Sequence, residues 1–471
     1  MTIGNSTICA ISTPQGVGGI ATARISGPDA ISIVSKIWKG ADLAGATTHT
    51  AHLGTILDSE LKPLDQGVAT IYRAPKSFTG EDTVEITVHG SRYVQRELIN
   101  SLITSGAKIA QPGEFTRRAF LSHKINLAEA EAIADIISSS SRAAHRIAIT
   151  QLRGGFTRKL AQLRDKLLQL ASLIELELDF SEEDVTFASR RQLVETAREI
   201  DIEVIRLKNS FKTGVAIKDG IPVAIAGKTN AGKSSLLNAI LEDDRAIVSD
   251  IHGTTRDIVE ENIEIGDYMF RLMDTAGIRE TDDKIEQIGI ERSLNAIRKA
   301  QLILTVIDST DSIDTGFINT LATNAAENPN DPTIIFIFNK TDLAPEAAKT
   351  LEEAIETLLP SQVSRHYVAI SATDRTNLSS LLDIMTNIID EQANPEQSQE
   401  NILITNARHL QILTEASQST ARLLQSINDN LSGELIAQDI RQTISILGEI
   451  TGDISSQEIL NNIFQRFCIG K

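Results

Sequence analysis

The stretch Gly227-Lys228-Thr229-Asn230-Ala231-Gly232-Lys233-Ser234 fits the phosphate-loop pattern G-x-x-x-x-G-K-[ST] and decides the fold of the middle of the chain. The apolar run 221–226 before it predicts a buried parallel strand, and residues 235–240 after it predict the start of a helix. The amides of the loop and of the helix N-terminus then converge on one anion site. We therefore expect nucleoside triphosphate binding, with Lys233 on the terminal phosphates, Ser234 on magnesium, and contacts from Asn230, Ala231, Gly232, Lys233, Ser234 and Ser235.

Three further segments follow in the order and spacing of a GTPase. Asp274-Thr275-Ala276-Gly277 ends the predicted strand 269–273, where a carboxylate can lie in the outer shell of magnesium and a glycine amide beside the last phosphate. Asn339-Lys340-Thr341-Asp342 follows the predicted strand 333–338, and the Asp342 carboxylate can accept two hydrogen bonds that guanine donates and adenine does not. Ser371-Ala372 follows the predicted strand 366–370, where a backbone amide can meet the guanine carbonyl. Each motif alone could be an ordinary turn, but together they favour GTP.

The residue after Gly277 is unusual for a GTPase. Signalling GTPases place a glutamine there to orient the attacking water, whereas this chain has Ile278, which cannot form a hydrogen bond to water. The loop 279–286 offers several carboxylates that could act as a general base, and no arginine finger can be assigned. Asn230 and the segment 249–257 could jointly supply neutral oxygens, which suit a monovalent cation better than a second divalent one.

Several segments together resemble the MnmE (TrmE) family of tRNA uridine modification GTPases, and the resemblance covers essentially the whole chain. In the N-terminal part they are 14–20, 24–27, 78–82 and 112–120, and further along they are Asn230, Gly253-Thr254-Thr255-Arg256-Asp257, Ile278, Glu286 and the final Cys468-Ile469-Gly470-Lys471. Lys228-Thr229 stands where the family usually has Arg-Pro, and Ser91 where it usually has glycine. Neither departure removes a phosphate or magnesium ligand.

The resemblance implies roles for particular residues of the GTPase part. Potassium would be ligated by Asn230, Ser249, Ile251 and Thr254, and magnesium by Ser234 and Thr255. Glu286 would be the catalytic carboxylate and would position the attacking water through a bridging water, while Cys468 is a catalytic residue whose role stays open. The residues expected to bind the nucleotide or its ions in the segments after the phosphate loop are Ser249, Asp250, Ile251, His252, Gly253, Thr254, Thr255, Asp274, Thr275, Ala276, Gly277, Asn339, Lys340, Asp342, Ser371 and Ala372.

The N-terminal part resembles the folate-binding domain of the family, which also forms the homodimer. A reduced folate has paired N–H donors on its pterin edge and an anionic tail, so its site needs a carboxylate and cations. By family position these residues are Arg24, Glu85, Lys124 and Lys471. Glu85 alternates with the apolar Val84 and Ile86, so it could equally be a solvent-facing strand residue.

The function that the resemblance implies is a potassium-activated GTPase acting in tRNA modification. With the flavin-dependent partner MnmG (GidA), in a heterotetramer, it would add a carboxymethylaminomethyl or aminomethyl group to C5 of the tRNA wobble uridine. The carbon would come from 5,10-methylenetetrahydrofolate or 5-formyltetrahydrofolate. The alternative is a GTPase switch in ribosome assembly, which has no need of the C-terminal cysteine motif or the folate-like N-terminal part.

Composition limits these possibilities. The 45 basic and 63 acidic residues give a net charge of −18, which argues against binding nucleic acid by overall charge. A tRNA would need a second protein or a local basic patch such as 153–166, although a solvated helix face is the more ordinary interpretation of that segment. Two cysteines, Cys9 and Cys468, exclude a disulfide framework. No run of 18 apolar residues and no leader segment occurs, so we expect a soluble, cytoplasmic protein.

The predicted architecture is multidomain, because a chain of 471 residues is too long to fold around a single hydrophobic core. Residues 1–120 alternate β-rich runs, such as 68–72 and 84–89, with a helix near 93–105, which predicts an α+β domain. The family resemblance implies that this domain binds folate and forms the homodimer. An all-α helical domain spans 121–219 and 388–471, and the α/β P-loop GTPase domain, 220–387, is inserted in it. The first helical part carries an apolar stripe for packing on another helix, namely Leu160, Leu163, Leu167, Leu170, Ile174 and Leu178.

Overall fold

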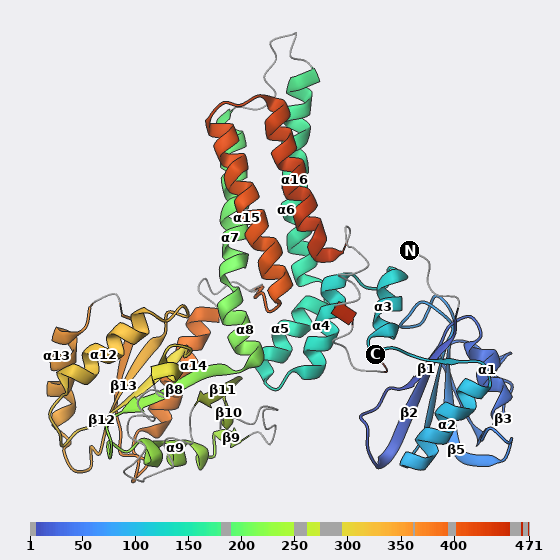
Figure 1. Ribbon diagram of the computed structural model, residues 1–471, viewed down its shortest axis with the longest axis horizontal. Helices are drawn as coiled ribbons and strands as arrows, with labels where there is room; N and C mark the ends of the chain where they lie inside the picture. Colours follow the sequence, from blue (N-terminus) through green and yellow to red (C-terminus); the bar gives the residue numbers. More distant parts are fainter. Residues whose placement is uncertain are drawn as a thin grey trace. The chain divides into compact units, whose positions relative to one another are not determined.

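The computed structural model describes residues 6–179, 190–248, 261–273, 294–360, 363–393, 402–452, 463–464 and 470. The chain divides into two compact units (Figure 1). The first unit comprises residues 1–134, 152–160 and 444–471, and the second comprises 135–151 and 161–443. No helix in the described part of the chain is long and apolar enough to cross a membrane.

The first unit is built on a seven-stranded, mostly antiparallel sheet in the order β3-β4-β5-β6-β2-β1-β7. The strand bounds are Ile8–Ile11 (β1), Gly18–Ser26 (β2), Trp38–Gly40 (β3), Thr50–Leu57 (β4), Pro63–Tyr72 (β5), Thr83–Gly90 (β6) and Lys108–Ile109 (β7). Only β1 and β7 pair in parallel. Helices α1 (Ala30–Lys36), α2 (Arg92–Thr104) and α3 (Glu114–Leu121) belong to the same unit, so the α+β character predicted for this region is correct. The sequence predicted only the second of these helices, because α1 and α3 span seven and eight residues and carry little periodic signal.

The two faces of this sheet differ because side chains alternate along a strand. On one face Ala23, Ile25 and Ile86 are fully buried and share a core cluster with Leu98 and Leu102 of α2. Residues in the alternate positions of β2, β5 and β6 point to the opposite face and are half-buried; they include Thr22, Arg24, Thr70, Tyr72, Glu85 and Thr87. This second face is therefore the polar one.

The second unit contains a seven-stranded sheet in the order β14-β13-β12-β8-β11-β10-β9. The bounds are Ile221–Gly227 (β8), Ala246–Val248 (β9), Glu261–Ile265 (β10), Tyr268–Met273 (β11), Leu302–Asp308 (β12), Thr333–Asn339 (β13) and Arg365–Ala369 (β14). The first five strands in this order are parallel, and β10 and β9 are antiparallel additions. All seven residues of β13 are buried, as expected for a strand with both faces covered.

Helices pack on both faces of this sheet. One core cluster joins the strands to α8 (Phe211–Asp219), α9 (Lys233–Leu241) and α14 (Leu378–Ala393). The other joins them to α12 (Thr315–Ala326) and α13 (Ala347–Leu358). The strands predicted before each nucleotide motif and the helix predicted after the phosphate loop are all present, as β8, β11, β13, β14 and α9.

Long helices make up most of the remaining described residues (Figure 1). They are α4 (Leu127–Ser138), α5 (Arg142–Leu152), α6 (Gly155–Asp179), α7 (Arg190–Asn209), α15 (Ala407–Asn428) and α16 (Gly433–Thr451). The guanidinium of Arg190, at the start of α7, donates to the carbonyl of Ile427, at the end of α15, so these two helices run antiparallel. The predicted apolar stripe is buried from Leu160 to Ile174, whereas the side chain of Leu178 lies outside the described part of the structure.

Candidate functional site

The phosphate loop connects β8 to α9 at the carboxyl edge of the parallel strands, where α/β folds place their ligands. Three of its residues have left-handed backbone angles, with φ of 146° at Gly227, 63° at Asn230 and 97° at Gly232. A Cβ atom on Gly227 would clash with the Val306 carbonyl, and one on Gly232 would clash with the side chain of Asn339. Both glycines are therefore required by close packing as well as by backbone angle.

The ammonium group of Lys233, which is expected to bind phosphate, forms hydrogen bonds to the phosphate loop itself. Its ammonium group donates to the carbonyl of Gly227 at 2.8 Å and to that of Lys228 at 2.7 Å. Burial lowers the pKa of Lys233 from its ordinary value. Asn230, Ser234 and Ser235 are exposed, whereas Ala231 is buried. The loop thus presents several of its predicted phosphate and metal ligands to solvent around one lysine.

Asn339 joins the phosphate loop to the predicted base-recognition segments. Its side chain is 2% exposed; its amide nitrogen donates to the Ala231 carbonyl at 3.0 Å, and its amide oxygen accepts from the Ala372 backbone N–H at 3.0 Å. The Thr341 N–H donates to the Ile370 carbonyl at 3.2 Å. Three segments that lie far apart in the sequence therefore meet at one edge of the sheet. Asp342 is exposed at this edge.

Sequence reasoning missed Asp308, the last residue of β12. Its carboxylate lies 2.5 Å from the ammonium of Lys340, and it is 11% exposed. The same carboxylate accepts from the backbone N–H and the hydroxyl of Thr310. The position of Asp308 at the carboxyl end of a buried parallel strand was the available signal.

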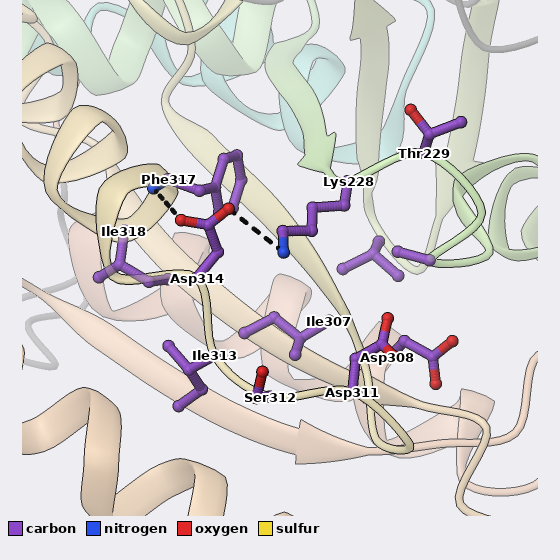
Figure 2. A pocket seen from close by; sticks show the side chains of 12 residues that line it. Lys228, Thr229, Ile307, Asp308, Asp311, Ser312, Ile313, Asp314, Phe317 and Ile318 are labelled. Carbon is purple, nitrogen blue, oxygen red and sulfur yellow. Dashed lines mark hydrogen bonds and ion pairs between the residues drawn. The ribbon is translucent and has the colours of Figure 1, made fainter.

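A small cavity of about 30 Å³ lies beside the phosphate loop (Figure 2). Lys228 and Thr229 form one wall, and the β12–α12 connection forms the other. The ammonium of Lys228 lies 3.2 Å from the carboxylate of Asp314, which also caps α12 by accepting from the Phe317 N–H at 3.0 Å. This cavity lies on the side of the phosphate loop that carries Lys228 and Thr229.

Many predicted site residues lie outside the part of the chain that the structure describes. They are Ser249, Asp250, Ile251, His252, Gly253, Thr254, Thr255, Asp274, Thr275, Ala276, Gly277, Ile278, Glu286, Cys468 and Lys471. Of the proposed potassium ligands only Asn230 is described, and of the proposed magnesium ligands only Ser234.

A second polar site lies on the half-buried sheet face of the first unit. Arg24 and Glu85 face each other across β2 and β6, and the Arg24 Nε and Nη2 atoms lie 2.9 and 2.8 Å from Glu85 Oε1. The Tyr72 hydroxyl approaches the other oxygen, Oε2, at 3.5 Å. Burial, together with the negative charge of Glu85, raises the pKa of Tyr72. The guanidinium also lies 5.4 Å from the ring centre of Phe78.

This arrangement bears on the two interpretations of Glu85. Its side chain is 25% exposed and paired, so it is neither fully solvated nor in the core. Both close contacts from Arg24 fall on Oε1, which leaves Oε2 with only the long contact from Tyr72. The pair can therefore present an acceptor and a cation side by side to a ligand with matching polar groups.

Two further predicted regions lie in the same unit. Lys124 is exposed, and a Cβ atom on Gly80 would lie 3.6 Å from its side chain, so it neighbours the segment that carries Phe78. Gly470, which precedes Lys471, packs against the backbone of Ile11 and Ser12 at the end of β1.

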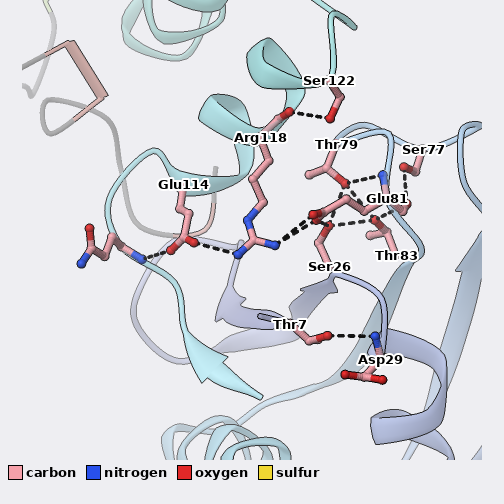
Figure 3. A network of polar contacts seen from close by, with 11 residues as sticks. Thr7, Ser26, Asp29, Ser77, Thr79, Glu81, Thr83, Glu114, Arg118 and Ser122 are labelled. Carbon is pink, nitrogen blue, oxygen red and sulfur yellow. Dashed lines mark hydrogen bonds and ion pairs between the residues drawn. The ribbon is translucent and has the colours of Figure 1, made fainter. Parts of the chain in front are cut away.

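A buried ionic network joins two of the family-like segments, 78–82 and 112–120 (Figure 3). The guanidinium of Arg118, 4% exposed, donates to both oxygens of Glu81 at 3.1 Å and to Glu114 at 2.9 Å. The hydroxyl of Ser26 donates to Glu81 at 2.7 Å. The network therefore locks the two segments to β2, beside the strand positions of the Arg24 pair, which gives them a structural role.

Comparisons with known proteins cover nearly the whole length of the chain. The family model described as the MnmE helical domain matches residues 127–468, and the model described as the N-terminus of the GTP-binding protein TrmE matches residues 7–124. The tRNA modification GTPase MnmE of Parabacteroides distasonis is 45% identical over 471 residues, covering 99% of this chain and 100% of that protein. The protein of the same name from Bacteroides thetaiotaomicron is 45% identical over 469 residues, covering 99% of each.

Proposed function

The chain belongs to the MnmE family of tRNA modification GTPases, and we propose that its GTP hydrolysis is activated by potassium and drives modification of the tRNA wobble uridine. The modification adds a carboxymethylaminomethyl or aminomethyl group to C5, with 5,10-methylenetetrahydrofolate or 5-formyltetrahydrofolate as the carbon source. A flavin-dependent partner of the MnmG (GidA) type takes part. Full-length relatives named for tRNA modification favour this function over a ribosome-assembly switch.

The meeting of the three nucleotide motifs at one sheet edge carries the proposal. Asn339 connects the loop that would hold phosphate to the segment that would contact the guanine carbonyl. Gly232 lets the loop pack against that side chain, and Lys233 lies at the loop. Asp342, on the same turn as Asn339, supplies the carboxylate that distinguishes guanine from adenine.

Different residues around this edge would bind the metal ions and position the attacking water. Ser234 and Thr255 would hold magnesium, and Asn230, Ser249, Ile251 and Thr254 would hold potassium. Potassium supplies positive charge for the transition state in a chain without an assigned arginine finger. Glu286 would orient the attacking water, since Ile278 has no polar group for that purpose.

The Arg24–Glu85 pair supports the folate part of the proposal. Glu85 Oε2 would accept from the pterin edge, while Arg24, Lys124 and Lys471 would face the anionic groups of the folate. Gly470 packs at the end of β1, which supports a role for Lys471 and Cys468 at the same unit. Cys468 would act in the modification chemistry.

We also retain the predicted organisation as a proposal. It comprises an N-terminal domain, 1–120, that forms the homodimer, a helical domain made of 121–219 and 388–471, and an inserted GTPase domain, 220–387. The homodimer would combine with the flavin-dependent partner in a heterotetramer. Because the net charge of this chain is −18, tRNA would need either that partner or a local basic patch to bind. The location would be the cytoplasm.

The test of potassium activation is a comparison of GTP turnover by the full chain in potassium chloride and in sodium chloride. The rate in potassium should be higher by about tenfold or more, the size of one lost electrostatic contact in a transition state. Asn230→Ala should remove the difference and leave GTP binding largely intact. Equal rates in the two salts would refute potassium activation.

The modification itself is tested by mass spectrometry of wobble nucleosides. In cells that lack the protein, the carboxymethylaminomethyl and aminomethyl uridines should disappear, and the unmodified uridine should accumulate. Normal wobble nucleosides in such cells would contradict the proposed reaction and leave the GTPase assignment unaffected.

A further inference from the structure

Asp308 lies at the meeting point of β12 and β13 and faces the base-recognition turn. It is directly opposite Asn339 in the strand register, and the next residue, Ser309, donates its N–H to the Asn339 carbonyl at 2.9 Å. The side chain of Asp308 is 11% exposed. Both carboxylate oxygens are engaged: Oδ2 with the ammonium of Lys340 at 2.5 Å, and Oδ1 with the Thr310 N–H and hydroxyl at 2.9 and 2.7 Å.

The side chain of Asp308 is ionised at neutral pH. Burial by itself would raise the pKa of Asp308, but the hydrogen bonds from Lys340 and Thr310 outweigh it and hold the pKa below its ordinary value. Asp308 is therefore an ionised carboxylate that the fold keeps in place opposite a lysine of the turn.

Lys340 occupies a constrained position between the two residues expected to read the nucleotide. Its backbone is left-handed, with φ of 64°, and it follows Asn339 and precedes Asp342 by two residues. Its carbonyl accepts from the Leu343 N–H at 3.0 Å, which closes the turn that carries Asp342. A free lysine side chain samples many rotamers, whereas the ammonium of this one pairs with a carboxylate that is only 11% exposed.

We propose that Asp308 is a positioning residue for guanine nucleotide binding. By holding the ammonium of Lys340, it fixes the turn from Asn339 to Asp342 before the nucleotide arrives, so that less conformational freedom is lost on binding. It also keeps the lysine from pairing with the exposed carboxylate of Asp342, which must stay available to the base. The proposal rests on GTP binding at this edge and does not depend on potassium, folate or the partner protein.

The test uses Asp308→Asn in the full chain, because this change removes the charge and keeps the shape. The dissociation rate of a fluorescent GDP, measured by stopped flow, and the KM for GTP should both rise by about tenfold. The kcat should stay within about twofold of the wild-type value, because the Asp308 carboxylate bonds to Lys340 and Thr310, which are not expected to contact the reacting phosphate.

Asp311→Asn is the matched control. Asp311 is an exposed carboxylate three residues further along the same connection, and it has no side-chain partner among the described residues. Its replacement should leave the dissociation rate and the KM unchanged. The wild-type protein must bind GDP and hydrolyse GTP in the same assay, which separates failure of this proposal from failure of the nucleotide site itself.

A double-mutant cycle separates positioning from general damage. Lys340→Gln should itself weaken GDP binding, and adding Asp308→Asn in that background should change the dissociation rate by less than about twofold. If Asp308→Asn does not fold, as judged by circular dichroism, the cycle is run with Asp308→Glu, which keeps the charge and should give a smaller loss than Lys340→Gln. The proposal would be overturned if the effects of the two substitutions on the GDP dissociation rate were fully additive in the double variant. It would also be overturned if Asp308→Asn bound GDP more tightly, or if it lowered kcat at unchanged KM.

Discussion

The sheet of the first unit is mostly antiparallel and packs helix α2 on one face, whereas the sheet of the second unit has five parallel strands and helices on both faces. This difference decides where polar residues can gather. On the first sheet they line a face, where Arg24, Tyr72 and Glu85 come from neighbouring strands. On the second sheet both faces are apolar, so the polar residues lie at the edge where the parallel strands end.

The two regions also differ in whether their charged and polar side chains are buried. Arg118 is buried with two carboxylates that hold chain segments together, while the phosphate loop and the turn after β13 leave Asn230, Ser234 and Asp342 exposed. We infer that the ionic network of the first unit serves stability and that the edge of the second serves chemistry. Substitutions in the two regions should therefore differ in what they change, stability in the first and chemistry in the second.

Arg118→Met should have the largest effect, because it leaves Glu81 buried without its main partner. Removing one member of a buried ion pair costs about 3–5 kcal/mol of unfolding free energy. The chain has one tryptophan, Trp38 in β3, so urea unfolding followed by tryptophan fluorescence reports on this unit. Arg96→Met, which removes a guanidinium 67% exposed, serves as the control and should change the midpoint little. Equal urea unfolding midpoints for the two variants would show that the network does not stabilise this unit.

Glu286→Ala should come next and should affect chemistry alone. Loss of a positioned general base is expected to lower kcat by about 100-fold or more, with little change in the dissociation constant for GTP. Single-turnover hydrolysis and equilibrium binding measure the two quantities separately. Asp282→Ala, in the same acidic loop, is the comparison; a larger loss from it would reassign the catalytic carboxylate.

Glu85→Gln tests whether the sheet face of the first unit is a ligand site. Affinity for 5-formyltetrahydrofolate should fall by about tenfold, since one charge-assisted contact with the pterin edge is weakened. Titration calorimetry of the full chain gives this value, and the GTP turnover of the variant should match wild type. Glu60→Gln, at a carboxylate 68% exposed, should leave folate affinity unchanged. Unaltered affinity in the Glu85 variant would make the Arg24 pair purely structural.

Lys228→Met should have the smallest effect, although Lys228 lies in the phosphate loop. Its partner Asp314 is 40% exposed and Lys228 is 51% exposed, and such surface pairs contribute about 0–1 kcal/mol. The KM for GTP should change by less than about threefold, as measured by steady-state hydrolysis. A larger change would mean that the departure from the Arg-Pro pair of the family matters to the stiffness of the loop.

The elements that sequence predicted correctly are those with a periodic or motif signal. The strands β8, β13 and β14 and the helix α9 were identified because apolar runs border known phosphate and base motifs. The stripe from Leu160 to Ile174 is buried because its residues recur every three or four positions.

What sequence reasoning missed are the contacts between distant segments, even where it had named one or both of the residues. Arg118 and Glu81 are 37 residues apart, and Lys340 and Asp308 are 32 apart, so no local pattern connects them. For Arg24 and Glu85, only the strand register, which pairs residues 61 apart, reveals that they are partners. Such pairings follow from sheet order, which a single sequence does not specify.

The two hydrogen bonds of the Asn339 amide have a thermodynamic consequence. Because one rigid side chain ties the Ala231 carbonyl to the Ala372 N–H, ordering either end of the site restricts the other. Occupation of the guanine end should then lower the entropy cost of occupying the triphosphate end, and the reverse must hold by linkage. We therefore expect the free energy of binding GTP to differ from the sum of the contributions of guanosine and triphosphate measured separately, with the buried amide of Asn339 as the coupling group.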